Sequence, residues 1–142
     1  MSFGRTASQL NNYVKATKAF EKVLEKVTII SLEDGNCTAE MKVSKEHTNP
    51  LGGLHGGFSA TLVDSISSFA LVSHKNGAIP SVSVDIHITY LKGAKLDDEI
   101  TIDARTIKTG KSLAFLEVLI KNKSTGELLV KGNHTKFFMH NI

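Results

Sequence analysis

The chain is organised around the segment His47-Thr48-Asn49-Pro50-Leu51-Gly52-Gly53-Leu54-His55-Gly56-Gly57, which is followed directly by a helical pattern over residues 58–73. Four of the six positions from 52 to 57 are glycine, which has no side chain to bury and loses the most backbone entropy on ordering. Such a cluster is typical of a segment that passes close to another backbone or to a ligand. It ends where a helix begins, and the free N–H groups and dipole of a helix start favour developing negative charge.

Residues 58–73 are predicted to form a long central helix with two different faces. Phe58, Leu62, Ile66 and Phe69 make one apolar stripe at helical spacing. Asp64 points away from this stripe, into a face of small residues that carries no Lys or Glu: Gly57, Ala60, Ser67, Ser68 and Leu71. We therefore expect both faces to be covered, the second by another subunit. Because aspartate is unfavourable inside a helix, Asp64 is either an interface residue or a catalytic carboxylate.

The composition indicates a single globular domain over residues 1–142, with 41% hydrophobic and 22% charged residues. The net charge of +3 suits an anionic ligand, but no basic tract with interleaved aromatics occurs, so we expect no nucleic-acid partner. A lone cysteine, Cys37, excludes an internal disulfide and fits a reducing compartment. No apolar run reaches the length of a membrane span. Residues 1–20 lack acidic side chains, as mitochondrial presequences do, but an ordinary first helix is favoured.

Hydrophobic periodicity predicts the other elements. Residues 8–25 form an amphipathic helix with Ser8 as N-cap, and residues 27–32 and 37–43 form a hairpin. A four-stranded meander follows, with strands at 82–90, 100–105, 114–120 and 127–138. In the first of these, Ser83 alternates with Val82 and Val84, which places it on the polar face that we assign to a subunit interface. The sum is an α+β fold in which one antiparallel sheet packs on one long helix.

Three kinds of chemistry are excluded by missing residues. His55-Gly56-Gly57 is similar to the oxyanion segment of lipases, but the nearby serine lies in Gly57-Phe58-Ser59-Ala60-Thr61, without the second glycine of a nucleophile elbow. The six histidines are scattered and form no pair at metal-ligand spacing, so we expect no metal. No Lys-Ser/Thr follows the glycines, which excludes a phosphate loop. Acid–base hydrolysis remains, with an N–H donor at a helix start and a carboxylate.

An ordered set of motifs then resembles one family. The set comprises His47-Thr48-Asn49, Leu54-His55-Gly56-Gly57, Ala60-Thr61-Leu62-Val63-Asp64, Val82-Ser83-Val84-Asp85 and Ile88-Thr89-Tyr90. In this order it resembles the hotdog-fold acyl-CoA thioesterases of the PaaI type, and most closely the animal members. The resemblance covers nearly the whole chain, including Ala94-Lys95-Leu96 and His134-Thr135-Lys136.

The resemblance implies a hotdog fold, in which an antiparallel sheet of about six strands wraps around one long central helix, here with an extra N-terminal helix. It also implies a homotetramer built as a dimer of dimers, with active sites at the dimer interface. The implied activity is hydrolysis of medium- to long-chain fatty acyl-CoA to the free acid and coenzyme A, in the cytoplasm or the mitochondrion. No cofactor is implied, since coenzyme A is part of the substrate.

Family roles carry over to five residues of this sequence. The Gly56 N–H polarises the thioester carbonyl, while Asn49 and His55 hold the loop and the carbonyl in position. Asp64, contributed by the partner subunit, activates water that Ser83 helps to orient. Attack by Asp64 itself through an anhydride is the alternative. We prefer a general base, because Ser83 gives the water a second partner.

The resemblance also implies contacts to coenzyme A. These involve Tyr90, the turn Lys108-Thr109-Gly110-Lys111-Ser112-Leu113, and Phe137, where animal relatives carry a polar residue and a contact here would be stacking. Two cations around a glycine suit phosphate groups. Two other functions stay open at this point: a hotdog hydratase or dehydratase, which generally uses a histidine with its acid, and a non-catalytic acyl-CoA binding protein.

Overall fold

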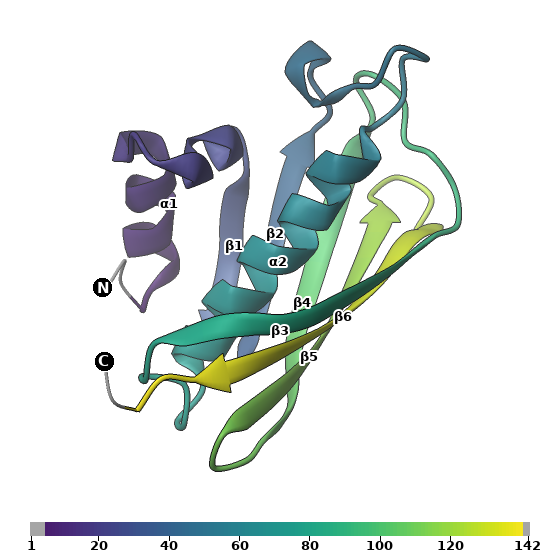
Figure 1. Ribbon diagram of the computed structural model, residues 1–142. Helices are drawn as coiled ribbons and strands as arrows, with labels where there is room; N and C mark the ends of the chain where they lie inside the picture. The colour runs from purple at the N-terminus through teal and green to yellow at the C-terminus, as the bar shows by residue number, and fades with distance from the viewer. Residues whose placement is uncertain (1–4, 141–142) are drawn as a thin grey trace.

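The computed structural model describes residues 5–140, most of which form one antiparallel sheet wrapped around one long helix (Figure 1). In chain order the elements are α1 (Ala7–Ala16), the 3-10 helix η1 (Phe20–Leu24), β1 (Thr28–Glu33), β2 (Asn36–Lys42), the 3-10 helix η2 (Lys45–His47), α2 (Gly56–Ser73), β3 (Ser81–Tyr90), β4 (Glu99–Thr109), β5 (Leu113–Asn122) and β6 (Leu128–Phe138). Between residues 5 and 140, no helix has the length and apolar character needed to cross a bilayer.

The sheet has the strand order β1-β2-β4-β5-β6-β3, and all neighbouring strands are antiparallel. The six strands and the central helix agree with the prediction, but the predicted four-stranded meander is wrong in one respect. Strands β4, β5 and β6 do follow one another, whereas β3 lies at the edge beside β6. β3 cannot pair with β4 as the meander predicted, because β4 already has β2 and β5 as its two neighbours.

The helix α2 lies against the concave face of the sheet and forms the centre of the core (Figure 1). Three of the four residues of its predicted apolar stripe, Leu62, Ile66 and Phe69, are buried, and Phe58 is partly buried. They pack with inward-facing apolar residues of the strands, among them Ile100, Ile102, Val118, Ile120 and Val130. This packing holds both the start and the middle of α2 at defined places on the sheet.

The predicted N-terminal helix over residues 8–25 is wrong at both ends. Its N-cap is Thr6, which forms a capping box with Gln9, and the helix α1 ends at Ala16. Thr17 is extended, and the chain then forms the separate element η1. A straight helix of 18 residues would be roughly 27 Å long and would carry Leu24 away from the core, whereas the break brings Leu24 back to full burial. Positions 1–4 of the predicted presequence-like segment lie outside the described residues.

A β-bulge in β3 changes which face Ser83 occupies. The pairing of β3 with β6 shifts by one residue between Ser83 and Asp85, so that Val84 is the extra residue. Ser83 consequently hydrogen-bonds the buried ring of His134 on the helix side of the sheet. The prediction that Ser83 lies on the outer polar face is therefore wrong, because one inserted residue reverses the alternation of side chains.

The small-residue face of α2 is partly covered by the same chain. Ser67 hydrogen-bonds His134, and Ser68 hydrogen-bonds Lys136, both on β6. The prediction that a second subunit covers this face is therefore wrong for the part around the two serines. The Asp64 side chain, one turn earlier, remains 47% exposed. A partner is thus needed only over that part of the helix.

Gly132 on β6 allows α2 to approach the sheet closely, and its replacement by alanine is expected to destabilise the protein. An added Cβ would lie 2.6 Å from Val63 Cγ1 and 2.8 Å from Val63 Cγ2. We expect Gly132→Ala to lower the free energy of unfolding by about 1–3 kcal/mol, measured by urea denaturation. The double variant Gly132→Ala/Val63→Ala removes the clash. Its loss of free energy of unfolding is therefore expected to be smaller than the sum of the losses in the two single variants. Simple additivity would contradict this explanation.

Candidate active site

The start of α2 presents a backbone N–H that lacks an acceptor. His55 is the N-cap residue, and its ring Nδ1 accepts the N–H of Gly57 at 2.8 Å. The His55 carbonyl accepts the N–H groups of Phe58 and Ser59, each at 3.0 Å. Within residues 5–140, no acceptor lies within hydrogen-bond distance of the Gly56 N–H. A free N–H at a helix start is the kind of donor that stabilises a developing oxyanion.

Gly56 borders a pocket of about 400 Å³ between the start of α2, the segment that follows β3, and the start of β6. The Tyr90 hydroxyl donates a hydrogen bond to the Gly56 carbonyl at 2.8 Å, which holds the ring beside the first turn of α2. Asn49 and Ser59 also line the pocket, together with apolar side chains such as Leu54. The pocket is therefore lined by apolar and polar groups in similar measure.

Asn49 and His55 hold the glycine-rich loop in place. The Asn49 side-chain Oδ1 accepts the N–H groups of Leu51 at 2.9 Å and of Gly53 at 3.1 Å. The His55 N–H donates to the carbonyl of His47 at 2.8 Å. These bonds close the turn before α2 and orient the backbone at Gly56. Because the Asn49 oxygen is occupied by the turn, only its amide nitrogen is left to face the pocket.

A second group of polar side chains lies at the middle of α2, around the ring of His134. The ring Nε2 lies 2.7 Å from Ser83 Oγ and 4.0 Å from Asp64 Oδ1. The ring Nδ1 lies 2.8 Å from Ser67 Oγ. The structure thus brings Asp64 and Ser83 together in one chain, and it does so through a histidine that is itself 1% exposed.

The hydrogen bonds around His134 are best satisfied by one tautomer. Ser67 Oγ lies 3.1 Å from the Asp64 carbonyl and can give that carbonyl its single proton. Nδ1–H of His134 then donates to Ser67, and Nε2 accepts the proton of Ser83. The opposite tautomer would satisfy one bond fewer, so we assign the proton to Nδ1. In this assignment the Ser83 oxygen keeps its lone pairs free to accept a further hydrogen bond.

The free N–H of Gly56 and the carboxylate of Asp64 lie on the same helix but far apart along it. Gly56 and Asp64 are separated by eight positions of α2, which is roughly 12 Å along the helix axis. A carbonyl group and its attacking water span only a few ångströms, so one chain cannot bring both groups to one carbonyl. We name the two groups of residues the donor half (Asn49, His55, Gly56 and Tyr90) and the base half (Asp64, Ser83 and His134), after the roles that the sequence predicts for Gly56 and Asp64.

Comparison with known proteins assigns the family. Residues 51–129, more than half of the chain, match the thioesterase superfamily. The chain belongs to the thioesterase superfamily. The prediction of a thioester-hydrolysing enzyme is thereby confirmed.

This thioesterase is similar to animal proteins over most of its length. It is 52% identical to human "Acyl-coenzyme A thioesterase 13" over 130 residues, which are 89% of this chain and 92% of the relative. Zebrafish thioesterase superfamily member 2 superposes with a TM-score of 0.90 at 40% identity, covering 96% of this chain and 100% of that one. A Streptococcus pneumoniae hypothetical thioesterase protein with coenzyme A superposes with a TM-score of 0.76 at 31% identity, covering 81% and 87%. The predicted hotdog fold and the resemblance to the animal members are confirmed.

The charges of the base half of the thioesterase are set mainly by burial. Burial lowers the pKa of His134 to about 4, and the nearby charge of Lys136 acts in the same direction, so the ring is neutral at pH 7. Its 4.0 Å approach to Asp64 is therefore not an ion pair at neutral pH. Burial raises the pKa of the Asp64 carboxyl, the Lys136 charge opposes this, and Glu21 of η1 adds to it. Among residues 5–140, no cluster of three His, Cys, Asp or Glu side chains is placed to hold a metal ion.

Protonation of His134 is expected to drive acid unfolding of the thioesterase. Its pKa rises from about 4 in the folded protein to the usual 6.5 on unfolding, so between these values only the unfolded chain binds the proton. The free energy of unfolding is therefore highest above pH 6.5. It is expected to fall by about 1.4 kcal/mol for each pH unit as the pH drops from 6.5 towards 4. Urea denaturation at several pH values measures this slope, which we expect His134→Gln to reduce. His87→Gln, on the exposed outer face, is the control, and equal slopes in wild type and His134→Gln would contradict the prediction.

The predicted coenzyme A contacts lie at opposite ends of the sheet (Figure 1). Leu113 pairs with Phe137, which pairs with Val82, whereas Tyr90 is eight residues further along β3, roughly 26 Å away. The structure therefore does not bring Tyr90 together with the Lys108–Leu113 turn in one chain. Phe137 is 43% exposed on the outer face of the sheet.

The Lys108–Leu113 turn borders its own hollow of about 610 Å³, which is also lined by Lys75 and His140. The Asn76 amide donates to Thr109 Oγ1 at 3.1 Å, and His140 Nε2 lies 2.7 Å from the Lys111 carbonyl. The turn is thus braced from two sides, with the Lys108, Lys111 and Ser112 side chains exposed. This geometry suits recognition of an anionic group by two lysines on a fixed turn.

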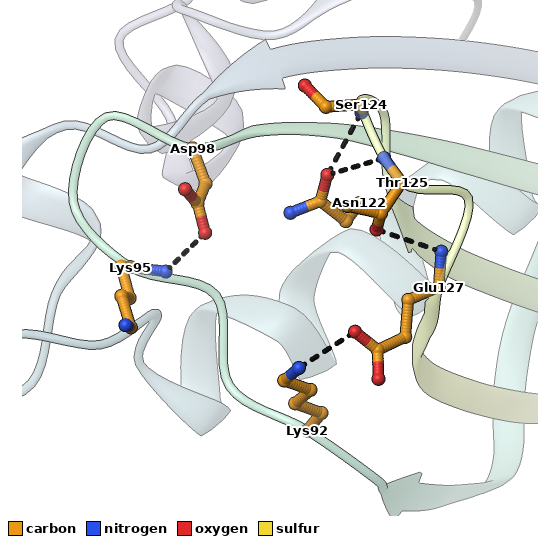
Figure 2. A network of polar contacts seen from close by, with 7 residues as sticks. All are labelled: Lys92, Lys95, Asp98, Asn122, Ser124, Thr125 and Glu127. Carbon is orange, nitrogen blue, oxygen red and sulfur yellow. Dashed lines mark hydrogen bonds and ion pairs between the residues drawn. The ribbon is translucent and has the colours of Figure 1, made fainter.

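The rim of the pocket beside Gly56 is held by a polar network between two loops. Lys92 Nζ pairs with Glu127 Oε1 at 2.8 Å. This ion pair, drawn in Figure 2, links the segment after β3 to the β5–β6 turn. Within that turn, Asn122 Oδ1 accepts the N–H groups of Ser124 and Thr125. These bonds fix the wall of the pocket that Lys92 forms.

Sequence reasoning missed two buried residues that bond the middle of α2, namely His134 of the base half and Lys136 beside it. Both are buried on β6 and face α2, although lysine in particular is rarely buried. Their alternation with the exposed residues Asn133 and Phe137 was a weak signal that they point inward. Their partners on α2 lie 67 and 68 positions away in the sequence, so only the fold reveals the contacts.

Proposed function

We propose that this thioesterase hydrolyses medium- to long-chain fatty acyl-CoA to the free fatty acid and coenzyme A. The observation that carries the proposal is the Gly56 N–H at the start of α2, which has no acceptor among the described residues and borders a pocket of mixed apolar and polar lining. The likeness to human acyl-coenzyme A thioesterase 13 supports the substrate class. The proposed enzyme works in the cytoplasm or the mitochondrion and uses no cofactor beyond the coenzyme A of its substrate.

In the proposed reaction the Gly56 N–H binds the thioester carbonyl oxygen. This oxygen gains negative charge when water attacks, and the helix dipole and the N–H stabilise that charge more than the neutral carbonyl. Tyr90 and His55 keep the first turn of α2 in position through their hydrogen bonds to Gly56 and Gly57. The amide nitrogen of Asn49, which borders the same pocket, is the second donor available to the carbonyl.

Asp64 acts as the general base in this proposal, and Ser83 orients the attacking water. Because Ser83 gives its proton to His134, its oxygen accepts one hydrogen of the water, while the Asp64 carboxylate takes the other. The water oxygen then points a lone pair at the carbonyl carbon. The tetrahedral intermediate expels the thiolate, and the proton held by Asp64 passes to the leaving sulfur. A half-buried carboxylate with a raised pKa suits both proton transfers.

The proposal requires two copies of the chain. Since Gly56 and Asp64 lie roughly 12 Å apart on one helix, the donor half of one subunit must face the base half of its partner. The exposed part of α2 around Asp64 provides room for this contact. We propose a homotetramer that is a dimer of such dimers, with each dimer carrying two sites.

A hydratase or dehydratase would need a histidine that reaches the substrate. The structure does place His134 4.0 Å from Asp64, but both ring nitrogens are occupied by Ser67 and Ser83, and the ring is buried. The two ring nitrogens of this histidine are therefore engaged by serine side chains and are not available to a substrate. This favours hydrolysis over hydration or dehydration.

A thiol-release assay with acyl-CoA substrates of different chain length and ring content tests the proposal. We expect release of one thiol per acid formed, fastest with medium to long chains. Crotonyl-CoA is the control for the alternative chemistry, because a hydratase removes its double-bond absorbance without releasing thiol. Tight binding of acyl-CoA with no thiol release would overturn the proposal in favour of a binding protein.

A further inference from the structure

Lys136 is a buried cation that the proposed mechanism does not use. It lies on the helix-facing side of β6, and only 7% of it is exposed. Its Nζ donates to Ser68 Oγ at 2.6 Å, and Ser68 donates to the backbone carbonyl of Asp64 at 2.8 Å. Within residues 5–140, no carboxylate oxygen lies within 4.0 Å of this ammonium group. A buried charge with a single neutral hydrogen-bond partner is costly and needs an explanation.

The charge of Lys136 is coupled to the charge of Asp64. Burial lowers the pKa of the Lys136 ammonium, and the negative charge of Asp64 opposes this. Conversely, the positive charge of Lys136 opposes the rise that burial causes in the pKa of the Asp64 carboxyl. Ser68 holds the ammonium one helical turn from Asp64, on the same face of α2.

Three charged or titratable groups face Asp64 from the elements that pack against it. From β6 these are Lys136 and His134, and from η1 it is Glu21. Glu21 disfavours the carboxylate form, and His134 is neutral at pH 7. Among the described residues, Lys136 is thus the group whose charge favours ionised Asp64 at neutral pH.

We infer that Lys136 is a positioning residue of the reaction, whose buried ammonium keeps Asp64 in the carboxylate form that accepts a proton from water. The inference rests on the proposed role of Asp64 as general base. A carboxylate at a subunit interface loses contacts with water, which disfavours its ionised form. The fixed positive charge of Lys136 offsets this effect, which explains why the cation is buried at this place. Ser68 serves as the tether that fixes the ammonium.

The test is the pH dependence of kcat/KM for thiol release by Lys136→Met, Lys136→Arg and wild type. Methionine has nearly the same length and no charge, so we expect the acidic limb of its profile to move upward by about one pH unit. At a given pH on the acidic limb, this displacement lowers kcat/KM about tenfold. The value of kcat/KM on the plateau at higher pH is expected to change less. Arginine keeps the charge and is expected to keep the wild-type limb. Lys131→Met, on the exposed outer side of the same strand, is the control with the same change in net charge.

A stability measurement separates this role from a structural one. Removing a buried charge removes its desolvation cost, so we expect Lys136→Met to unfold at a urea concentration at least as high as wild type. The combination of undiminished stability with a displaced acidic limb supports the inference. An unmoved acidic limb in Lys136→Met overturns it, whether or not the overall rate falls.

A milder variant guards against a folding defect in Lys136→Met. Ser68→Ala removes the tether but keeps the charge, and we expect a displacement of the acidic limb in the same direction and of smaller size. If Lys136→Met does not fold, an unmoved limb in Ser68→Ala overturns the inference. Failure of the underlying function is distinguishable, because wild type would then release no thiol, or Asp64→Asn would keep its activity.

Discussion

Replacing Asp64 with asparagine is expected to abolish thiol release while leaving acyl-CoA binding largely intact. Asparagine has the size of aspartate but cannot take a proton from water at neutral pH, so the variant loses the contribution of a positioned base. That contribution is commonly on the order of 100- to 10,000-fold in rate. Because 47% of the Asp64 side chain is exposed and asparagine has the same shape, the fold is expected to tolerate the change. Single-turnover thiol release and equilibrium binding of coenzyme A measure the two effects separately.

Asp85→Asn is the matched control for this experiment, because it removes the same charge from an exposed position on β3. We expect its turnover to stay near that of wild type. Near-normal turnover of Asp64→Asn would reject the general-base role. Trapping of an acyl-enzyme on Asp64 would instead identify the carboxylate as the nucleophile of an anhydride mechanism.

Replacing Gly56 with proline is expected to lower kcat/KM by about 100- to 1,000-fold, the usual effect of losing one oxyanion donor. Gly56 is the first residue of α2, a position where proline is well tolerated, because its missing N–H has no helical partner there. His55 before it has φ −64° and ψ 130°, which is the extended conformation that a residue preceding proline requires. The substitution therefore removes the N–H with little change in the helix.

Gly56→Ala is the matched control, because alanine adds a side chain but keeps the N–H. Its Cβ would lie 3.4 Å from the ring of Tyr90, which is an ordinary van der Waals contact. We expect Gly56→Ala to keep most of the activity, with thermal unfolding compared for both variants. Equal losses of kcat/KM in Gly56→Pro and Gly56→Ala would show that the added side-chain atoms, and not the missing N–H, reduce the activity.

Mixing the two inactive variants tests whether each site takes its groups from two chains. Asp64→Asn keeps a normal donor half, and Gly56→Pro keeps a normal base half. A mixed dimer then contains one intact site, so random reassociation of equal amounts is expected to restore about a quarter of the wild-type activity. If both groups of a site came from the same chain, mixing would restore nothing.

Much of the fold could be predicted from periodicity because it is local. The spacing of Leu62, Ile66 and Phe69 predicted the buried stripe of α2, and the alternation of Ile100 and Ile102 predicted an inward face of β4. The free N–H at Gly56 follows from the helix start alone. These features depend on residues within a few positions of one another, where the chemistry of the sequence acts directly.

The errors in the prediction all arose where distant segments meet. The break after α1 serves the burial of Leu24, and the bulge at Val84 turns Ser83 towards His134. Neither the break nor the bulge has a strong local signal, because each is stabilised by packing against another element.

The central helix, the glycines at its start and the carboxylate two turns later can be predicted from the residues alone, because helical geometry fixes the relation between residues on one element. The surroundings of that carboxylate depend on the fold. A buried histidine and a buried lysine on β6 reach α2 across the sheet, and the pairing of strands sets their depth and orientation. Side-chain burial and charge coupling depend on every element that packs at a point, so they appear only when the chain has folded.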